Sequence, residues 1–145
     1  MFLLSLIFTL FLISPVASTK WDKFTFDFQI TCRHYTKPTY WYSVQFLEND
    51  VFFSGEWITQ KYEERFVPGT IRRTFLGAMD GDEVGSSGYS VIAIFEHDCT
   101  KNGERTEVQF AFRNLCDIGR PCFMRYHADL TDQHGRIVGV YALTH

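Results

Sequence analysis

An alternation of apolar and polar residues with a period of two is the feature that most constrains this fold. Residues Phe24–Thr31 (FTFDFQIT) put apolar and polar side chains on opposite faces, as in a strand with one buried face. The segment Thr106–Arg113 (TEVQFAFR) repeats the pattern. Both segments therefore predict half-buried strands. The expected inward-facing residues are Phe24, Phe26, Phe28, Ile30, Val108, Phe110 and Phe112.

Further segments have the composition of strands. Tyr89–Glu96 is apolar on both faces, which is typical of a central strand. Tyr40–Leu47 is rich in aromatic and β-branched residues, which favour strands. Weaker strands are expected at Glu56–Lys61 and at Ile71–Leu76.

The C-terminal part predicts a final hairpin. Tyr126–Leu130 and Ile137–Leu143 are connected by Thr131–Gly135, which contains the Asp and Gly of a tight turn. No stretch keeps a helical apolar period over about three turns, although Gln60–Phe66 fits one short helical turn. About seven or eight strands at this spacing indicate an all-β sandwich or a small barrel.

Residues 1–18 have the pattern of a signal peptide. An apolar run over Leu3–Ile13 precedes small residues at Val16-Ala17-Ser18, which predicts cleavage after Ser18, with Ala17 as the alternative. The run is too short to cross about 30 Å of hydrocarbon comfortably, and no later segment is apolar for long enough. We therefore expect a secreted, extracellular protein that is not an integral membrane protein, with residues 19–145 as one domain.

The charge of the chain indicates no electrostatic partner. Its formal net charge is -3 at pH 7, and its only basic doublet is Arg72-Arg73. Nucleic-acid binding needs concentrated positive charge, so no nucleic-acid partner is expected.

The four cysteines all follow the predicted signal peptide. An even number in an exported chain of this size predicts two disulfides, although three pairings are possible. Cys116 and Cys122 flank a short segment and suit a small closed loop. This favours a second bond between Cys32 and Cys99, where loop closure predicts a stabilisation of about 4 kcal/mol.

Aromatic residues make up 17% of the chain, with 15 Phe. The phenylalanines lie on the expected inward strand faces, so a Phe-rich core explains them better than a cavity for an apolar ligand. The run Tyr40-Trp41-Tyr42 differs, because consecutive strand residues point to opposite faces and at least one ring must face outward.

Two groups of motifs carry a resemblance to a known family. The first is a strand that ends in Ile30-Thr31-Cys32, followed by a strand running into an acidic turn at Val44–Asp50. The second is a Phe-x-Gly turn, an acidic loop, an apolar strand and a His-Asp-Cys ending. Its members are Phe75-Leu76-Gly77, Asp82-Glu83, Tyr89–Ile94 and His97-Asp98-Cys99.

Over about residues 28 to 113, these motifs resemble the transthyretin-like family of secreted nematode proteins. The resemblance implies a seven- or eight-stranded antiparallel Greek-key β-sandwich of transthyretin type and an extracellular location. It also implies binding of lipid, cell surfaces or small molecules, which has been suggested for family members. The chain departs from the family at Arg65–Gly69, which replaces a Thr-Asp-x-x-Gly motif, and at Cys116–Cys122, which has no counterpart. These departures leave the disulfide pattern open.

The segment His97-Asp98-Cys99 has the residue types of a nucleophilic site but not the geometry. On a strand, His97 and Cys99 share a face while Asp98 points away, so the three form no relay, and a disulfide-bonded Cys99 is no nucleophile. The spacings of a structural zinc site are absent, and the acidic loop Asp80–Gly88 lacks the spacing of an EF-hand. No cofactor or metal is therefore expected.

An extracellular binding or adaptor protein without catalytic activity is the leading functional prediction. Its partner is expected to be an extracellular protein, a cell surface or a lipid, contacted through Trp41 and Trp57, with Glu83 steering a basic partner. The alternative is an extracellular carrier of a small hydrophobic ligand or lipid, held inside the sandwich or at a dimer channel. A hydroxyisourate-hydrolase-like enzyme comes third, because the C-terminal Tyr-Arg-Gly-Ser of those enzymes is matched here only by Tyr141.

Overall fold

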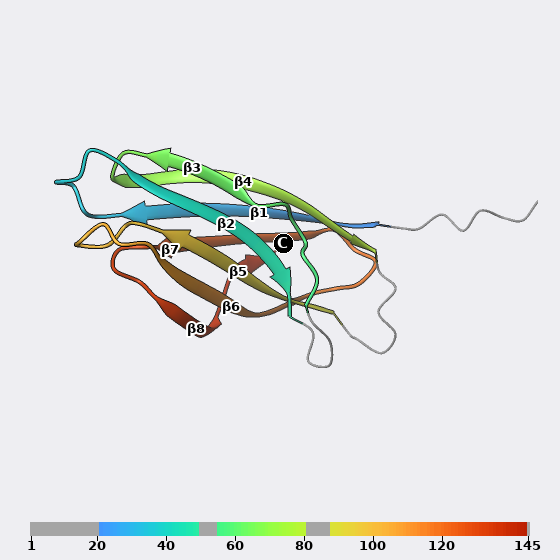
Figure 1. Cartoon of the computed structure of the whole chain (residues 1–145). Helices are drawn as coiled ribbons and strands as arrows, with labels where there is room; N and C mark the ends of the chain where they lie inside the picture. The colour runs from blue at the N-terminus through green and yellow to red at the C-terminus, as the bar shows by residue number, and fades with distance from the viewer. Residues whose placement is uncertain (1–20, 50–54, 81–87, 145) are drawn as a thin grey trace, which may run out of the picture.

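All the secondary structure in the described part of the computed structural model is β-strand (Figure 1). The structure describes residues 21–49, 55–80 and 88–144. The predicted signal peptide Met1–Ser18 and Glu83 lie outside these ranges. The described strands are β1 (Trp21–Cys32), β2 (Tyr40–Glu48), β3 (Tyr62–Phe66), β4 (Gly69–Asp80), β5 (Tyr89–His97), β6 (Thr106–Cys116), β7 (Cys122–Asp129), β8 (Gly135–Val140) and β9 (Leu143–Thr144).

The strands form two sheets that pack in two layers, which agrees with the predicted β-sandwich. One sheet has four strands in the order β4-β1-β7-β9, and the other has five in the order β3-β2-β5-β6-β8. The strands predicted from period-two alternation are confirmed in β1 and β6, and those at Tyr40–Leu47 and Tyr89–Glu96 are confirmed in β2 and β5. β5 is central in its sheet, as its two apolar faces indicate.

Two corrections concern the pairing of strands. The sheets are mixed rather than purely antiparallel, because β1 pairs with β7 in parallel and β6 pairs with β8 in parallel. The predicted C-terminal hairpin is also wrong, since β7 and β8 belong to different sheets. The turn residues do reverse the chain locally, but the partly buried Ile137 and Val140 of β8 lie beside β6 rather than beside β7.

The predicted last strand is divided between the two sheets. Gly139 of β8 has a φ of 73°, and after Val140 the chain leaves β8 and crosses to β7, where β9 pairs antiparallel with Met124 and Arg125. The crossing is held by the Ala142 N–H, which donates to Asn114 Oδ1 at 2.9 Å. The division explains why the described part has nine strands where about seven or eight were expected.

The segment before β3 covers an edge of the sandwich instead of forming the expected strand. Ile58 N donates to Phe46 O of β2 at 2.9 Å, and Ala78 N of β4 donates to Ile58 O at 3.1 Å. This contact requires Gly77, because a Cβ there would lie 2.6 Å from Ile58 O. The short helical turn suggested for Gln60–Phe66 is the strand β3.

The space between the sheets is filled by aromatic rings. Phe26 and Phe46, from opposite sheets, stack with centroids 3.9 Å apart, and Phe28 makes an edge contact with Phe46 at 5.2 Å. The observed disulfides are Cys32–Cys99 and Cys116–Cys122, which is the favoured pairing. Each disulfide connects the two sheets, because β1 and β7 belong to one and β5 and β6 to the other.

Candidate functional site

Trp41 and Trp57 lie on the outer face of the five-stranded sheet. On β2 the side chains of Tyr40 and Tyr42 are buried in the core, so Trp41 between them points outward. Trp57 forms an isolated antiparallel bridge with Leu47, whose side chain also points outward, and Trp57 is 52% exposed. The two indoles therefore share one face but lie at opposite ends of β2, about 20 Å apart at 3.3 Å per residue.

Trp57 is the first residue of an apolar row that crosses this sheet at right angles to its strands. Strand register places Leu47 opposite Ile92, Ile92 opposite Ala111, and Ala111 opposite Val138. Only the ends of the row are widely open to solvent, at Trp57 and at Val138, which is 69% exposed. The row crosses β2, β5, β6 and β8 but not β3, and with Trp57 it extends about 20 Å at 4.8 Å between strands.

Trp41 is held in a fixed position by its backbone and by a cation. Its N–H donates to Asp98 Oδ1 at 2.6 Å, and its carbonyl accepts from Asp98 N at 3.1 Å. The Arg105 guanidinium lies over the indole, 4.2 Å from the ring centroid. Arg65 of β3 is the cross-strand neighbour of Trp41 on the other side. The result is an aromatic ring stacked under one arginine, with a second arginine on the neighbouring strand.

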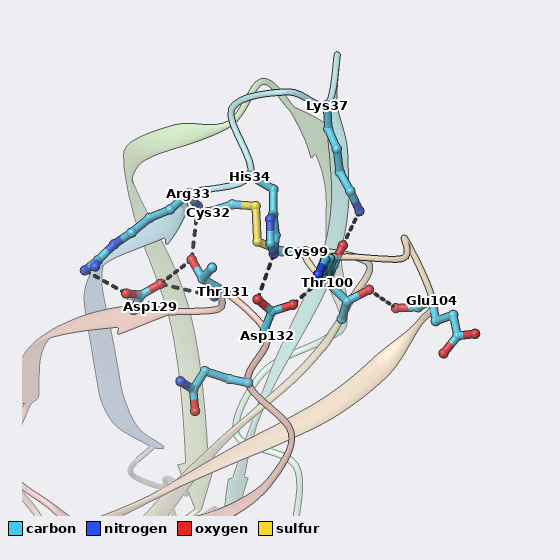
Figure 2. A network of polar contacts seen from close by, with 12 residues as sticks. Cys32, Arg33, His34, Lys37, Cys99, Thr100, Glu104, Asp129, Thr131 and Asp132 are labelled. Atoms are coloured by element: carbon cyan, nitrogen blue, oxygen red, sulfur yellow. Dashed lines mark hydrogen bonds and ion pairs between the residues drawn. A yellow bond between two sulfur atoms is a disulfide. The ribbon is translucent and has the colours of Figure 1, made fainter.

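Three loops meet at the Trp41 end of the sandwich, over the disulfide Cys32–Cys99 (Figure 2). Asp132 lies at their junction: its N–H donates to Cys99 O at 2.9 Å, and its Oδ1 accepts from Lys101 N at 2.7 Å. Its Oδ2 is 3.0 Å from His34 Nε2, an ion pair when His34 is protonated. Acceptance of the Lys101 N–H keeps the pKa of Asp132 below its usual value. Asp132 adopts a left-handed φ of 54°, which Asp tolerates better than most residues.

Further polar contacts make this end of the molecule rigid. Lys37 donates to the carbonyl of Asp98 at 3.1 Å and to that of Thr100. Arg33 forms an ion pair of 2.8 Å with Asp129, whose Oδ1 also accepts from the Thr131 hydroxyl at 2.7 Å (Figure 2). Loops held on a rigid scaffold are common positions for binding residues.

The residues His97, Asp98 and Cys99 all have structural contacts. Cys99 is in the disulfide, and Asp98 accepts the Trp41 N–H. His97 is fully buried, and its Nε2 donates to Gln133 O at 3.0 Å. Burial lowers the pKa of His97, so its ring is neutral with the proton on Nε2. The structure therefore brings these side chains together as connections between loops, not as a catalytic relay.

Several predicted features can now be placed. Among residues 21–49, 55–80 and 88–144 there is no group of three or more His, Cys, Asp or Glu side chains arranged to hold a metal ion. The same ranges contain no helix long and apolar enough to cross a membrane. Glu83 and most of the acidic loop lie outside the described residues.

Two residues of the surface were not singled out from the sequence. Arg105 stacks on Trp41 from a loop that lacks any local motif, so no sequence signal indicates it. Tyr35 is 71% exposed in the loop after β1. Its position between a cysteine and Pro38 is consistent with a loop but not with any particular role.

Comparisons with protein-family models, with curated proteins and with solved structures find no match for this chain.

Proposed function

We propose that this chain is a secreted recognition protein without catalytic activity, which binds an extracellular protein, a cell surface or a lipid. We define its recognition face as the outer surface of the five-stranded sheet that carries Trp41, Trp57, Val138 and Arg105. The observation that carries the proposal is the apolar row from Trp57 to Val138, with a fixed Trp-Arg stack on the same face.

The composition of this face resembles that of known protein interfaces. Trp, Tyr and Arg are enriched among the residues that contribute most binding energy, because they bury large areas around a polar group. Trp57 and Val138 retain exposed apolar surface at either end of the row. A partner that covers the row would remove this surface from water, at about 25 cal/mol for each Å² buried.

The cysteines support an extracellular location for the chain. Two disulfides indicate an oxidising environment. Together with the apolar N-terminal segment, they support our proposal that the chain is exported and that Met1–Ser18 is its signal peptide.

We also propose that the sandwich is of the transthyretin-like Greek-key type. The most specific motif of the resemblance, the strand ending in His97-Asp98-Cys99, supports this, because a disulfide joins it to the strand ending in Cys32. The mixed sheets are compatible with a sandwich of this kind but do not by themselves define the family.

The alternative of a hydrophobic-ligand carrier receives less support. The rings between the sheets pack closely, with Phe24 and Tyr89 at 5.2 Å and Phe112 and Tyr126 at 5.0 Å. This packing argues against a ligand inside the sandwich. No observation favours the hydrolase alternative.

A matched pair of tryptophan variants tests the recognition face. We expect Trp57→Ala and Trp41→Ala each to weaken binding about tenfold or more, because truncation of a tryptophan that anchors an interface removes a large contact area. Trp21→Ala is the control, since Trp21 is 56% exposed but lies on β1 of the other sheet. The measurement is saturable binding of labelled protein to cells, to immobilised extracellular protein and to lipid vesicles.

Unchanged binding by both Trp41→Ala and Trp57→Ala would contradict the proposed face. Equal losses in Trp21→Ala would indicate a general effect of removing surface tryptophan. Thermal unfolding of each variant shows whether the fold is retained.

A further inference from the structure

A pocket lies at the rim of the sandwich, where one edge of each sheet faces the other. β3 is an edge strand of the five-stranded sheet, and it leads through Val67-Pro68 into β4, an edge strand of the four-stranded sheet (Figure 1). The pocket between these edges has a volume of about 360 Å³. This volume is within the range of small-molecule sites in proteins, which begins at about 300 Å³.

Aromatic side chains form much of the wall of this pocket. Tyr62 of β3 and Phe75 of β4 pack with ring centroids 5.1 Å apart, and Tyr42 of β2 also lines the pocket. Aromatic walls favour a ligand that is itself a flat ring, because rings gain from stacked and edge contacts. A cavity of about 150 Å³ accommodates one benzene ring, so this pocket has room for one ring or two fused rings.

An ion pair between the two strands forms the polar part of the pocket. Arg73 of β4 donates to Glu64 of β3 through Nε at 2.9 Å and through Nη2 at 2.6 Å. The hydrogen bonds from Arg73 keep the pKa of Glu64 below its usual value, and Glu64 raises the pKa of Arg73. Both groups are therefore charged at neutral pH and balance each other. A charged ligand would find no unpaired opposite charge here, so the pocket favours a neutral one.

Glu64 retains hydrogen-bonding capacity for a ligand. A carboxylate offers about four acceptor positions. Among the described residues three are used: Arg73 Nε and the Tyr42 hydroxyl donate to Oε2, both at 2.9 Å, and Arg73 Nη2 donates to Oε1. The fourth position, on Oε1, can accept from an N–H or O–H group. Beside Tyr42, the Tyr40 hydroxyl is also buried without a partner in the described part of the chain.

We propose that this pocket binds a small, neutral aromatic molecule of one or two fused rings that carries an N–H or O–H donor. Its rings contact Tyr42, Tyr62 and Phe75, and its donor binds Glu64 Oε1. The site goes beyond the recognition face, because Glu64 pairs with the inward-facing Tyr42, whereas the recognition face is the outer surface of the same sheet. The two sites can therefore be tested separately. The pocket also differs from a cavity between the sheets, since it lies at their rim.

Calorimetric titration of the full exported chain with indole and with 1-methylindole tests the proposed donor. The two probes have nearly the same shape, but only indole has an N–H. We expect indole to bind at one site per chain and 1-methylindole to bind about tenfold more weakly, because hydrogen bonds to charged groups contribute strongly. Equal affinities for the two probes, or no saturable binding of indole, would overturn the proposal.

A matched pair of glutamate variants tests the position of the site. Glu64→Gln leaves one acceptor oxygen for Arg73 and Tyr42, so we expect indole binding to weaken about tenfold. Glu96→Gln is the control, since Glu96 forms a similar ion pair with Lys61 at 3.1 Å, and it should bind indole like the wild type. Thermal unfolding shows whether each variant is folded, and the comparison of the two probes on the wild type does not depend on the variants. Unchanged indole affinity in folded Glu64→Gln also contradicts the site, because indole is then bound elsewhere.

Discussion

At the scale of single residues, Asp27 shows how a buried carboxylate is accommodated on a strand. It lies on the outer face of β1 with a side chain only 5% exposed, between Arg72 of β4 and Arg125 of β7. Arg125 Nε donates to Asp27 Oδ2 at 2.8 Å. The hydrogen bond from Arg72 is the largest influence, and together with Arg125 it outweighs burial and lowers the pKa of Asp27 to about 2. The carboxylate thus connects three adjacent strands.

Replacement of Asp27 by Asn is expected to lower the free energy of unfolding by about 1–2 kcal/mol at pH 7, because the two guanidiniums lose the negative charge and one of the two acceptor oxygens. The loss stays modest because both guanidiniums are partly exposed to water. An unfolded Asp titrates near 3.9, so the contribution of Asp27 is present above about pH 4 and is lost as the pH falls toward 2. Urea unfolding at pH 7 and pH 3 measures this difference. Asp117→Asn is the control, since the Asp117 side chain is 65% exposed. An equal acid dependence in Asp27→Asn and the wild type would contradict the assignment.

At the scale of elements, His97 connects β5 to the loop that follows β7. Its Nε2 donates to Gln133 O, while its Nδ1 is buried without a partner in the described part of the chain. Asp98 and Asp132 are the charged groups that act on the ring, and both favour its protonation, but desolvation is the larger influence and lowers the pKa. The neutral ring therefore holds the loop over the core.

Because the folded pKa of His97 lies below its unfolded value of about 6.5, stability is complete above that pH and declines as the pH falls below it. His97→Gln keeps a donor for Gln133 O but does not titrate. We expect this variant to show a flatter decline of the melting temperature between pH 7.5 and 5. His34→Gln is the control for a second histidine in the same loop cluster. Parallel declines in wild type and His97→Gln would contradict this role.

At the scale of the whole molecule, the two disulfides join the sheets at opposite ends. Cys32 ends β1, whereas Cys122 begins β7 and pairs with Phe24 near the start of the parallel strand β1. The ends are about 26 Å apart at 3.3 Å per residue. Each bond holds one end of the sandwich closed, so neither replaces the other.

The loss of stability on removing each disulfide follows from the length of the loop that the bond closes. The separation of 67 residues between Cys32 and Cys99 predicts that the double variant Cys32→Ser with Cys99→Ser loses about 4 kcal/mol of unfolding free energy. The separation of 6 residues predicts a loss of about 2 kcal/mol for Cys116→Ser with Cys122→Ser. The free energy of unfolding in urea measures both. A larger loss from the short loop would show that native contacts, rather than loop closure, dominate.

Local patterns were sufficient for β1, β2, β5 and β6, but they placed a strand at Glu56–Lys61 and a helical turn over the residues that form β3. The alternation in Phe24–Thr31 predicted the buried rings of β1, and the same rule predicted that at least one ring of Tyr40-Trp41-Tyr42 faces outward, which the structure shows to be Trp41. Cysteine count and spacing indicated the two bonds. These features depend on neighbouring residues or on short chain segments, so the sequence carries them directly.

Pairing between distant strands was decided only by the tertiary structure. Period-two alternation defines which face of β7 and β8 is buried but not which strand lies beside them, so the parallel partners β1 and β6 were not predicted. For the same reason, the row from Trp57 to Val138 and the stack of Arg105 on Trp41 emerge only when the register is known. The sequence by itself determined which side chains β1, β2, β5 and β6 bury, whereas packing of the two sheets determined which side chains share a surface.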